Sequence, residues 1–237
     1  MAEESNLKWG LLIDLDKCSG CQTCVTACGM ENNIPFTGEA EAAYGRSLWW
    51  IRIERLWNGD FPNVKASFQP VMCQQCGSAP CEPVCPVFAS VHSQDEHINL
   101  QVYNRCIGTR YCANNCPYFA RLFNWFDYNL PDPMYYSFNP DVTVRRRGVM
   151  EKCTFCIQRI RRSEQTAKSE GRALQDGEIT PACAQACPTG AIVFGNLADP
   201  TSQAAKLALS QRRFSLLEDL GTEPKVIYLK GGGTYGG

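Results

Sequence analysis

The sequence contains no long apolar segment. Its apolar runs are short, and LLI at residues 11–13 and AIVF at residues 191–194 are typical of them. A membrane-spanning helix needs about 18 or more consecutive, mostly apolar residues. We therefore expect a chain that does not itself cross a membrane.

The N-terminal segment offers no secretory signal. Residues 1–10 are acidic and then polar, without an apolar core or a twin-arginine pair. We expect the protein to be membrane-associated through a partner. It would lie on the cytoplasmic side, or on the periplasmic side if a partner that carries a signal exports it.

An excess of positive charge is also lacking. The chain has 23 Lys and Arg residues against 24 Asp and Glu residues, which gives a formal net charge of −1. Nucleic-acid binding needs a basic excess or a concentrated basic face, so this class of partner is not expected. The dense basic cluster near the middle is Arg145, Arg146 and Arg147, which we expect to form a solvated loop or an edge facing a partner.

Residues typical of catalysis are scarce. The sequence has two histidines, His92 and His97, and shows no paired carboxylates at a plausible site, no Ser–His arrangement and no glycine-rich phosphate loop. We expect a non-catalytic protein, in which each histidine is a structural or exposed residue rather than a metal ligand.

What the chain does have is fifteen cysteines in 237 residues. A disulfide framework would favour an even count, a shorter chain and a secretory signal. The cysteines instead form four ordered groups. These are Cys18, Cys21, Cys24 and Cys28; Cys73, Cys76, Cys81 and Cys85; Cys106, Cys112 and Cys116; and Cys153, Cys156, Cys183 and Cys187.

The spacing within these groups indicates iron-sulfur clusters. In the bacterial run C-x2-C-x2-C-x3-C-P, three cysteines bind one cluster and the fourth binds another. The first group has this spacing, with Gly29 in place of the proline, and three groups end in Cys-Pro. Structural zinc sites also use C-x2-C pairs, but they usually take two separated pairs rather than a triplet with a fourth cysteine. The spacing leaves open which groups share clusters.

The third group lacks one cysteine. In CIGTRYCANNCP, residues 106–117, Thr109 stands where the second cysteine should be. A threonine hydroxyl is a poor substitute for a thiolate, so the expected result is a 3Fe-4S cluster at which Thr109 marks the vacant ligand position. The alternative is a four-iron cluster with water, hydroxide or the threonine oxygen on one iron.

Local patterns predict a mixture of helices and strands. We expect strands at residues 8–16, 47–57 and 226–229, a short helix that starts at Cys28, and two short strands around a polar turn at residues 93–96. Residues 157–176 favour a surface helix, and Asp199 and Pro200 can begin a helix that runs to Leu220 and ends at Gly221.

Aromatic residues and glycine mark two further segments. Trp49 and Trp50 are expected in the core or at a subunit interface. The aromatic stretch at residues 118–138 contains prolines and cannot be one regular element; it suits either a subunit interface or a cover that excludes water from a cluster. The glycine-rich residues 231–237 are expected to form a flexible tail or an arm along a partner.

The four ordered groups and the three Cys-Pro endings resemble the four-cluster iron-sulfur subunit of dimethyl sulfoxide reductase-type molybdopterin oxidoreductases. The resemblance implies an α+β fold of two interleaved two-cluster ferredoxin-like domains with loop insertions and a C-terminal helix, strand and tail. The first domain would comprise residues 1–66 and 150–197, the second residues 67–149, and the C-terminal part residues 198–237.

The resemblance also implies the ligand sets, with the first group paired to the fourth and the second to the third. Three 4Fe-4S clusters and one 3Fe-4S cluster would use every cysteine once. The four-iron sets would be Cys18, Cys21, Cys24 and Cys187; Cys28, Cys153, Cys156 and Cys183; and Cys73, Cys76, Cys81 and Cys116, and the three-iron set would be Cys85, Cys106 and Cys112.

The function implied is a relay of single electrons. The first and fourth groups would face a molybdopterin-containing catalytic subunit, and the second and third would face an integral membrane, quinone-reactive subunit. Residues 103–118 also resemble the iron-sulfur subunit of alternative complex III, a quinol-oxidising respiratory assembly without a functioning molybdenum site. A free soluble polyferredoxin is the third hypothesis.

Overall fold

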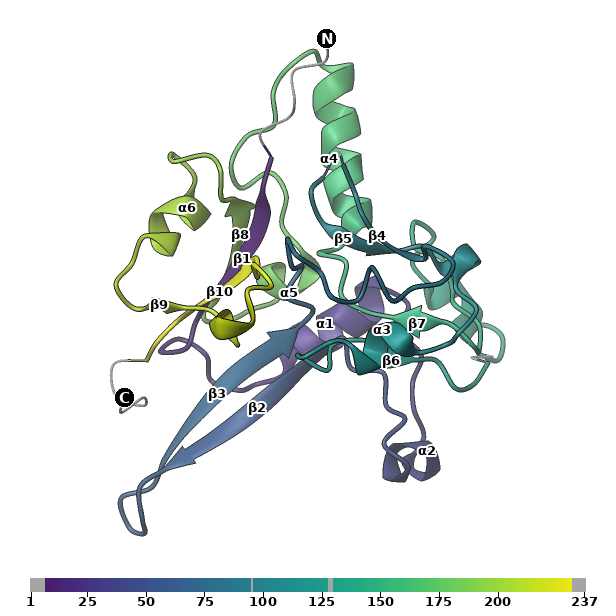
Figure 1. Cartoon of the computed structure of the whole chain (residues 1–237), viewed down its shortest axis with the longest axis horizontal. Helices are drawn as coiled ribbons and strands as arrows, with labels where there is room; N and C mark the ends of the chain where they lie inside the picture. Colours follow the sequence, from purple (N-terminus) through teal and green to yellow (C-terminus); the bar gives the residue numbers. More distant parts are fainter. Residues whose placement is uncertain (1–6, 95, 128–129, 232–237) are drawn as a thin grey trace.

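The computed structural model describes residues 7–94, 96–127 and 130–231. A sheet of four strands, in the order β8-β1-β10-β9, joins segments far apart in the sequence (Figure 1). The apolar strand β1 (Trp9–Asp14) pairs antiparallel with β8 (Ile192–Asn196) and parallel with β10 (Val226–Leu229). The strands expected near residues 8–16 and at 226–229 are therefore confirmed.

Two helices carry cysteines of the first and fourth groups and pack against each other. Helix α1 (Thr23–Glu31) begins five residues earlier than expected, so Cys28 lies within it and not at its start. The reason is local: Gln22 has a left-handed backbone (φ 64°), and the helix begins as soon as this turn ends. Helix α5 (Ala182–Gln185) carries Cys183 and contacts α1.

A long hairpin follows the first cysteine group. Strands β2 (Ile51–Asn58) and β3 (Lys65–Met72) pair antiparallel along their whole length and project from the body of the molecule (Figure 1). The expected strand therefore begins at Ile51 rather than at residue 47. Trp50 is buried in the core, as expected, whereas Trp49 is exposed. The short helix α2 (Glu39–Ala43) precedes the hairpin.

The segment between the second and third groups has the predicted strand pair. Strand β4 (Ser90–His92) pairs antiparallel with β5 (Asn99–Gln101). The 3-10 turn η1 (Tyr103–Arg105) and the short helix α3 (Tyr111–Asn114) lie on either side of the loop that holds Thr109.

The aromatic stretch forms only short elements, as predicted. These are β6 (Leu122–Phe123), which pairs with β7 (Met150–Glu151), and the 3-10 turn η2 (Met134–Ser137). Residues 128 and 129 of the stretch lie outside the described part of the chain.

Arg145 corrects the expectation of a solvated basic loop. Its side chain is buried and its guanidinium pairs with the Glu151 carboxylate at 2.9 Å, whereas Arg146 and Arg147 are exposed. The acid that neutralises Arg145 is six residues further along the chain and is itself fully buried. Because Glu151 neutralises its charge, Arg145 can be buried although the other two arginines of the run are exposed.

The surface helix predicted at residues 157–176 is confirmed over a shorter range, as α4 (Ile157–Ser169). The prediction of one long helix from Asp199 and Pro200 to Leu220 is wrong. Helix α6 spans only Gln203–Ala208, and its N-terminus is capped by Ser202, whose hydroxyl accepts from the Ala205 N–H at 3.0 Å.

Residues 213 and 214, within the segment where the helix was predicted, instead form a strand of the sheet. Strand β9 (Arg213–Phe214) pairs with β10, and the ring of Phe214 packs on that of Tyr228 at 5.5 Å between centroids. Tertiary pairing therefore overrides the helix-favouring sequence. The turn η3 (Glu218–Leu220) ends at Gly221, whose positive φ of 62° is the conformation glycine favours.

Among the described residues, no helix is long and apolar enough to cross a membrane. One hydrophobic core includes apolar side chains of β1, β8 and β10 together with cysteines of all four groups. Of the glycine-rich tail, residues 232–237 lie outside the described residues.

Candidate metal centres

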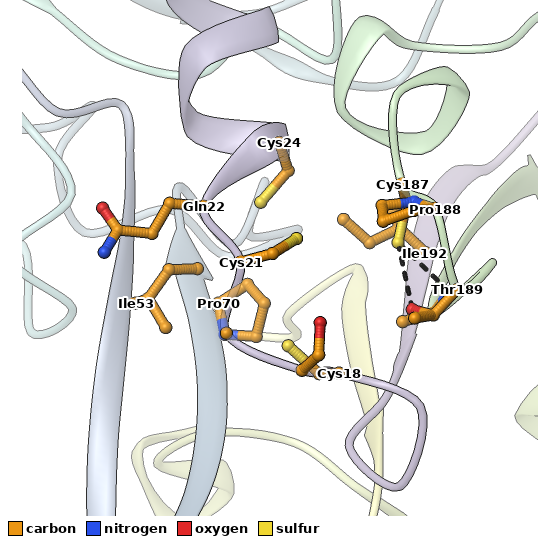
Figure 2. Close-up of a pocket in the computed structure, with 13 residues that line it drawn as sticks. Cys18, Cys21, Gln22, Cys24, Ile53, Pro70, Cys187, Pro188, Thr189 and Ile192 are labelled. Carbon is orange, nitrogen blue, oxygen red and sulfur yellow. Dashed lines mark hydrogen bonds between the residues drawn. The ribbon is translucent and has the colours of Figure 1, made fainter.

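The first cavity brings together cysteines from the first and fourth groups. Cys18, Cys21, Cys24 and Cys187 line it. Figure 2 shows the four sulfur atoms directed around this space, with Ile53 and Pro70 of the hairpin beside them. We call these four cysteines the Cys18 set.

The thiols of the Cys18 set lie close enough to influence one another. Burial raises the pKa of Cys24 to about 11, and repulsion from Cys18, Cys187 and Cys21 adds to the shift. The Cys187 sulfur accepts a hydrogen bond from the Ala191 N–H at 3.3 Å. A positive charge placed among these sulfurs would relieve their repulsion.

The backbone of this loop fixes where its thiols point. Gly20 and Gln22 have φ of 69° and 64°, both in the left-handed region. At Gly20 a Cβ atom would lie 2.4 Å from the Phe68 ring, so only glycine fits between the loop and the hairpin. Cys21, between these two residues, is exposed.

Cys28, Cys153, Cys156 and Cys183 form the Cys28 set, which is wholly buried. Burial raises the pKa of Cys28 well above its ordinary value, and Cys153, Cys156 and Cys183 raise it further by repulsion. The Asn32 amide donates to the sulfurs of Cys28 and Cys156, at 3.6 and 3.7 Å. Asn32 thus holds thiols of two cysteine groups together.

A second cavity holds cysteines of the second and third groups. Cys73, Cys76, Cys81 and Cys116, the Cys73 set, line about 300 Å³ of space together with Asn99 and Arg121. Burial raises the pKa of Cys76 to about 12, with further repulsion from Cys73, Cys81 and Cys116.

Cys85, Cys106 and Cys112 form the Cys106 set. Burial raises the pKa of Cys112, with a further contribution from Cys106, while the nearby Arg121 opposes the shift. The N–H groups of Ala89 and Met150 donate to the sulfurs of Cys85 and Cys106, at 3.2 and 3.3 Å.

Thr109 lies in a loop with the same backbone as the loop of Cys21. Gly108 and Arg110 on either side have φ of 74° and 63°, and α3 begins at the next residue, as α1 does after Gln22. Thr109 is exposed, as Cys21 is. The threonine therefore stands at the structural position that Cys21 has in the Cys18 set.

The donor chemistry fits iron-sulfur clusters. Each set consists of thiols, which as thiolates are the ligands that such clusters use, and several sulfurs accept N–H hydrogen bonds of the kind that tune them. Within the described residues, no three or more His, Cys, Asp and Glu side chains are close enough together to bind a single metal ion, so the cysteines of a set would have to bind a larger group that lies between them. The two cavities lie between sulfurs and are lined by four cysteines each.

The two histidines lie outside the cysteine sets. His92 contacts the Glu82 carboxylate through Nδ1 at 3.2 Å and lies 3.4 Å from the Lys225 ammonium through Nε2. His97 is half-buried and has a positive φ of 51° beside the β4–β5 turn. Sequence reasoning missed the buried Asn32, Asn99 and Arg121, because a lone polar residue outside a motif gives no signal of its position.

Comparisons with known proteins agree with this chemistry. The model of the 4Fe-4S dicluster domain matches residues 17–89 and 105–191. The chain is 47% identical over 231 residues to the iron-sulfur cluster-binding subunit of menaquinone reductase from Nitratidesulfovibrio vulgaris, with 96% of this chain and 90% of that protein covered.

Two further relatives are also iron-sulfur subunits. A putative dimethyl sulfoxide reductase iron-sulfur subunit from Halobacterium salinarum is 34% identical, with 94% of this chain and 79% of that protein covered. The Hdr-like menaquinol oxidoreductase iron-sulfur subunit 1 from Archaeoglobus fulgidus is 37% identical, with 95% and 84% covered. The chain therefore belongs to the 4Fe-4S dicluster family and, with these relatives, to the iron-sulfur subunits of dimethyl sulfoxide reductase-type oxidoreductases.

Proposed function

We propose that this chain is the electron-transfer subunit of a quinone-linked oxidoreductase complex. The Cys18, Cys28 and Cys73 sets each bind a 4Fe-4S cluster, and the Cys106 set, with Thr109 at its vacant position, binds a 3Fe-4S cluster. The clusters supply one-electron transfer, which no side chain of this chain provides. The chain itself positions them, excludes water and presents two ends to partners.

The observation that carries this proposal is the order of the thiol sets. Burial raises the pKa of Cys183, and after its own set the next contributor is Cys24 of the Cys18 set. Likewise Cys73 raises the pKa of the buried Cys153, and Cys81 that of the buried Cys112. Each set thus has a thiol close enough to one of the next set for their charges to interact, which supports a line running from the Cys18 set through the Cys28 and Cys73 sets to the Cys106 set.

The Cys106 end of this line has exposed apolar side chains. At the Cys106 end, the apolar side chains of Ile107, Tyr111, Phe88 and Phe119 are exposed, with exposed fractions of 59–76%. Ile107 and Tyr111 flank the exposed Thr109 in the sequence, Phe88 follows Cys85, and Phe119 follows Cys116. Such an apolar surface suits an interface. It supports docking of an integral membrane, quinone-reactive subunit at this end and of a molybdopterin-containing catalytic subunit at the Cys18 end.

The interleaved domains follow from the same pairing. Residues 1–66 with 150–197 would form one ferredoxin-like unit and residues 67–149 the other. The antiparallel pairing of β1 with β8 and the contact of α1 with α5 support the first unit. The pairing of β4 with β5 supports the second.

The names of two relatives favour a quinone-linked partner, since they contain menaquinone and menaquinol. They do not separate the molybdopterin complex from an assembly like alternative complex III. Metal analysis of the native complex, purified through a tag on this chain, tests the proposal. Molybdenum without c-type haem supports the molybdopterin complex. Haem c without molybdenum supports the alternative assembly, and a lone soluble chain would refute both in favour of a free polyferredoxin.

A further inference from the structure

Arg121 is a buried cation whose hydrogen-bond acceptors are all neutral. It lies five residues after Cys116 and is 5% exposed. Its guanidinium donates to the Gln101 and Asn99 side-chain oxygens at 2.7 Å each, and to the Ser90 hydroxyl. A buried, uncompensated charge costs several kcal/mol, so an anionic group must balance it.

The guanidinium faces two cysteine sets at once. Arg121 lines the cavity of the Cys73 set. The Ser90 hydroxyl, which accepts a hydrogen bond from Arg121, itself donates to the Cys81 sulfur of the Cys73 set at 3.6 Å. Ala89, the residue before Ser90, donates its N–H to the Cys85 sulfur of the Cys106 set at 3.2 Å, and the positive charge of Arg121 favours the Cys85 thiolate. The charge therefore lies between the Cys73 set and the Cys106 set.

Arg145 is the contrasting case of a buried arginine that is paired with a carboxylate. It is as deeply buried as Arg121, but its charge is neutralised by the Glu151 carboxylate at 2.9 Å. The carboxylate near Arg121 is that of Glu82, which is reached through the Asn99 amide and also contacts His92. Arg121 is therefore much less neutralised by protein carboxylates than Arg145.

We propose that Arg121 is the counter-cation shared by the Cys73 and Cys106 sets, and that it raises the reduction potentials of the clusters held by both. The inference rests on the proposed relay. Reduction adds one negative charge to a cluster, and a fixed positive charge nearby favours the reduced form. Net charge and hydrogen bonding are among the factors that set cluster potentials. Arg121 acts here as a positioning and tuning residue.

The test is a redox titration of the intact complex, followed by electron paramagnetic resonance (EPR). In Arg121→Gln, the reduced-to-oxidised ratio of both clusters at a fixed potential should fall by about tenfold or more, which corresponds to a downward shift of about 59 mV for a one-electron couple. The clusters of the Cys18 and Cys28 sets should be unaffected. Arg121→Lys keeps the charge and should recover most of the shift.

A second variant tests the proposal even if the complex that contains Arg121→Gln does not assemble. Gln101→Glu keeps the guanidinium and places a carboxylate at the acceptor 2.7 Å from it. It should lower the same two potentials. The control is Arg172→Gln, which removes a partly exposed arginine paired with Glu178 and should shift neither potential.

The outcomes separate this inference from the proposed relay. Intact EPR signals with unchanged potentials in Gln101→Glu or Arg121→Gln would overturn the role of Arg121 and leave the relay standing. An equal shift at all four clusters would also overturn it, because the effect would then not be local. Absence of both cluster signals from the wild-type complex would instead refute the proposed relay.

Discussion

Replacing Thr109 by cysteine should convert the proposed three-iron site into a four-iron site. The loop already has the backbone that presents Cys21 in the Cys18 set, with left-handed residues on either side of the ligand position. Gly108 fits against the Gly148 carbonyl, and the Arg110 guanidinium lies over the rings of Phe123 and Trp125, at 5.3 and 5.0 Å. These contacts hold the loop in place whichever side chain occupies residue 109.

The expected magnitude follows from this geometry. Thr109 is exposed, so the free energy of unfolding should change by no more than about 0.5 kcal/mol. Iron should rise from about 15 to about 16 atoms per chain, because one added thiolate holds one added iron. The potential of this cluster should fall, since cluster type and charge set it.

The assay is EPR of the oxidised complex together with iron quantification. The wild type should show a three-iron signal, which Thr109→Cys abolishes and the control Thr109→Ser keeps. A wild type with about 16 iron atoms and no such signal would refute the reasoning, and would favour a four-iron cluster with an oxygen ligand at residue 109.

Three further perturbations test other parts of the molecule. Cys21→Thr should create a second three-iron signal, because Cys21 occupies in the Cys18 set the position that Thr109 has in the Cys106 set. Glu151→Gln should lower the free energy of unfolding by about 3–5 kcal/mol, seen as an earlier thermal transition of the complex, because it leaves Arg145 buried without its charge partner. Ile107→Ser with Phe119→Ser should weaken binding of the membrane subunit, measured by co-purification, without changing the EPR signals.

The stability and docking predictions have matched controls, and the prediction for Cys21 has a contradicting result. Glu54→Gln breaks a partly exposed ion pair and should cost no more than about 1 kcal/mol; an equal cost for Glu151→Gln would contradict the importance of burial. Leu209→Ser removes an equally exposed apolar side chain near α6 and should leave the complex intact. If Cys21→Thr yields no new three-iron signal although the other clusters assemble, the equivalence of the two loops is wrong.

Motif spacing predicted the cysteine groups because ligand geometry is local. The thiols of a tight C-x2-C-x2-C loop are positioned by the loop itself and not by distant segments. The missing cysteine at residue 109 can therefore be recognised from the sequence alone. The strand at residues 226–229 was predictable for a similar reason, since it is short and apolar. The pairing of groups needed a resemblance to a family, because it depends on contacts between distant segments.

Long-range contacts also explain what could not be predicted. Arg145 was expected in solvent because its run of three arginines is basic, but the buried Glu151 neutralises it. The expected helix to Leu220 fails because residues 213 and 214 pair with β10. Arg121 carries no motif, and only folding places it between two cysteine sets.

We propose that the fifteen cysteines hold three four-iron clusters and one three-iron cluster. Mössbauer spectroscopy of the iron-57-labelled native complex, with iron and acid-labile sulfide counted per copy of this chain, tests this composition most directly after any iron in the partner subunits is subtracted. We expect about 15 iron atoms and about 16 sulfides, with about one fifth of the iron in a three-iron cluster. Zinc in place of iron, or about 16 iron atoms without a three-iron component, would contradict it.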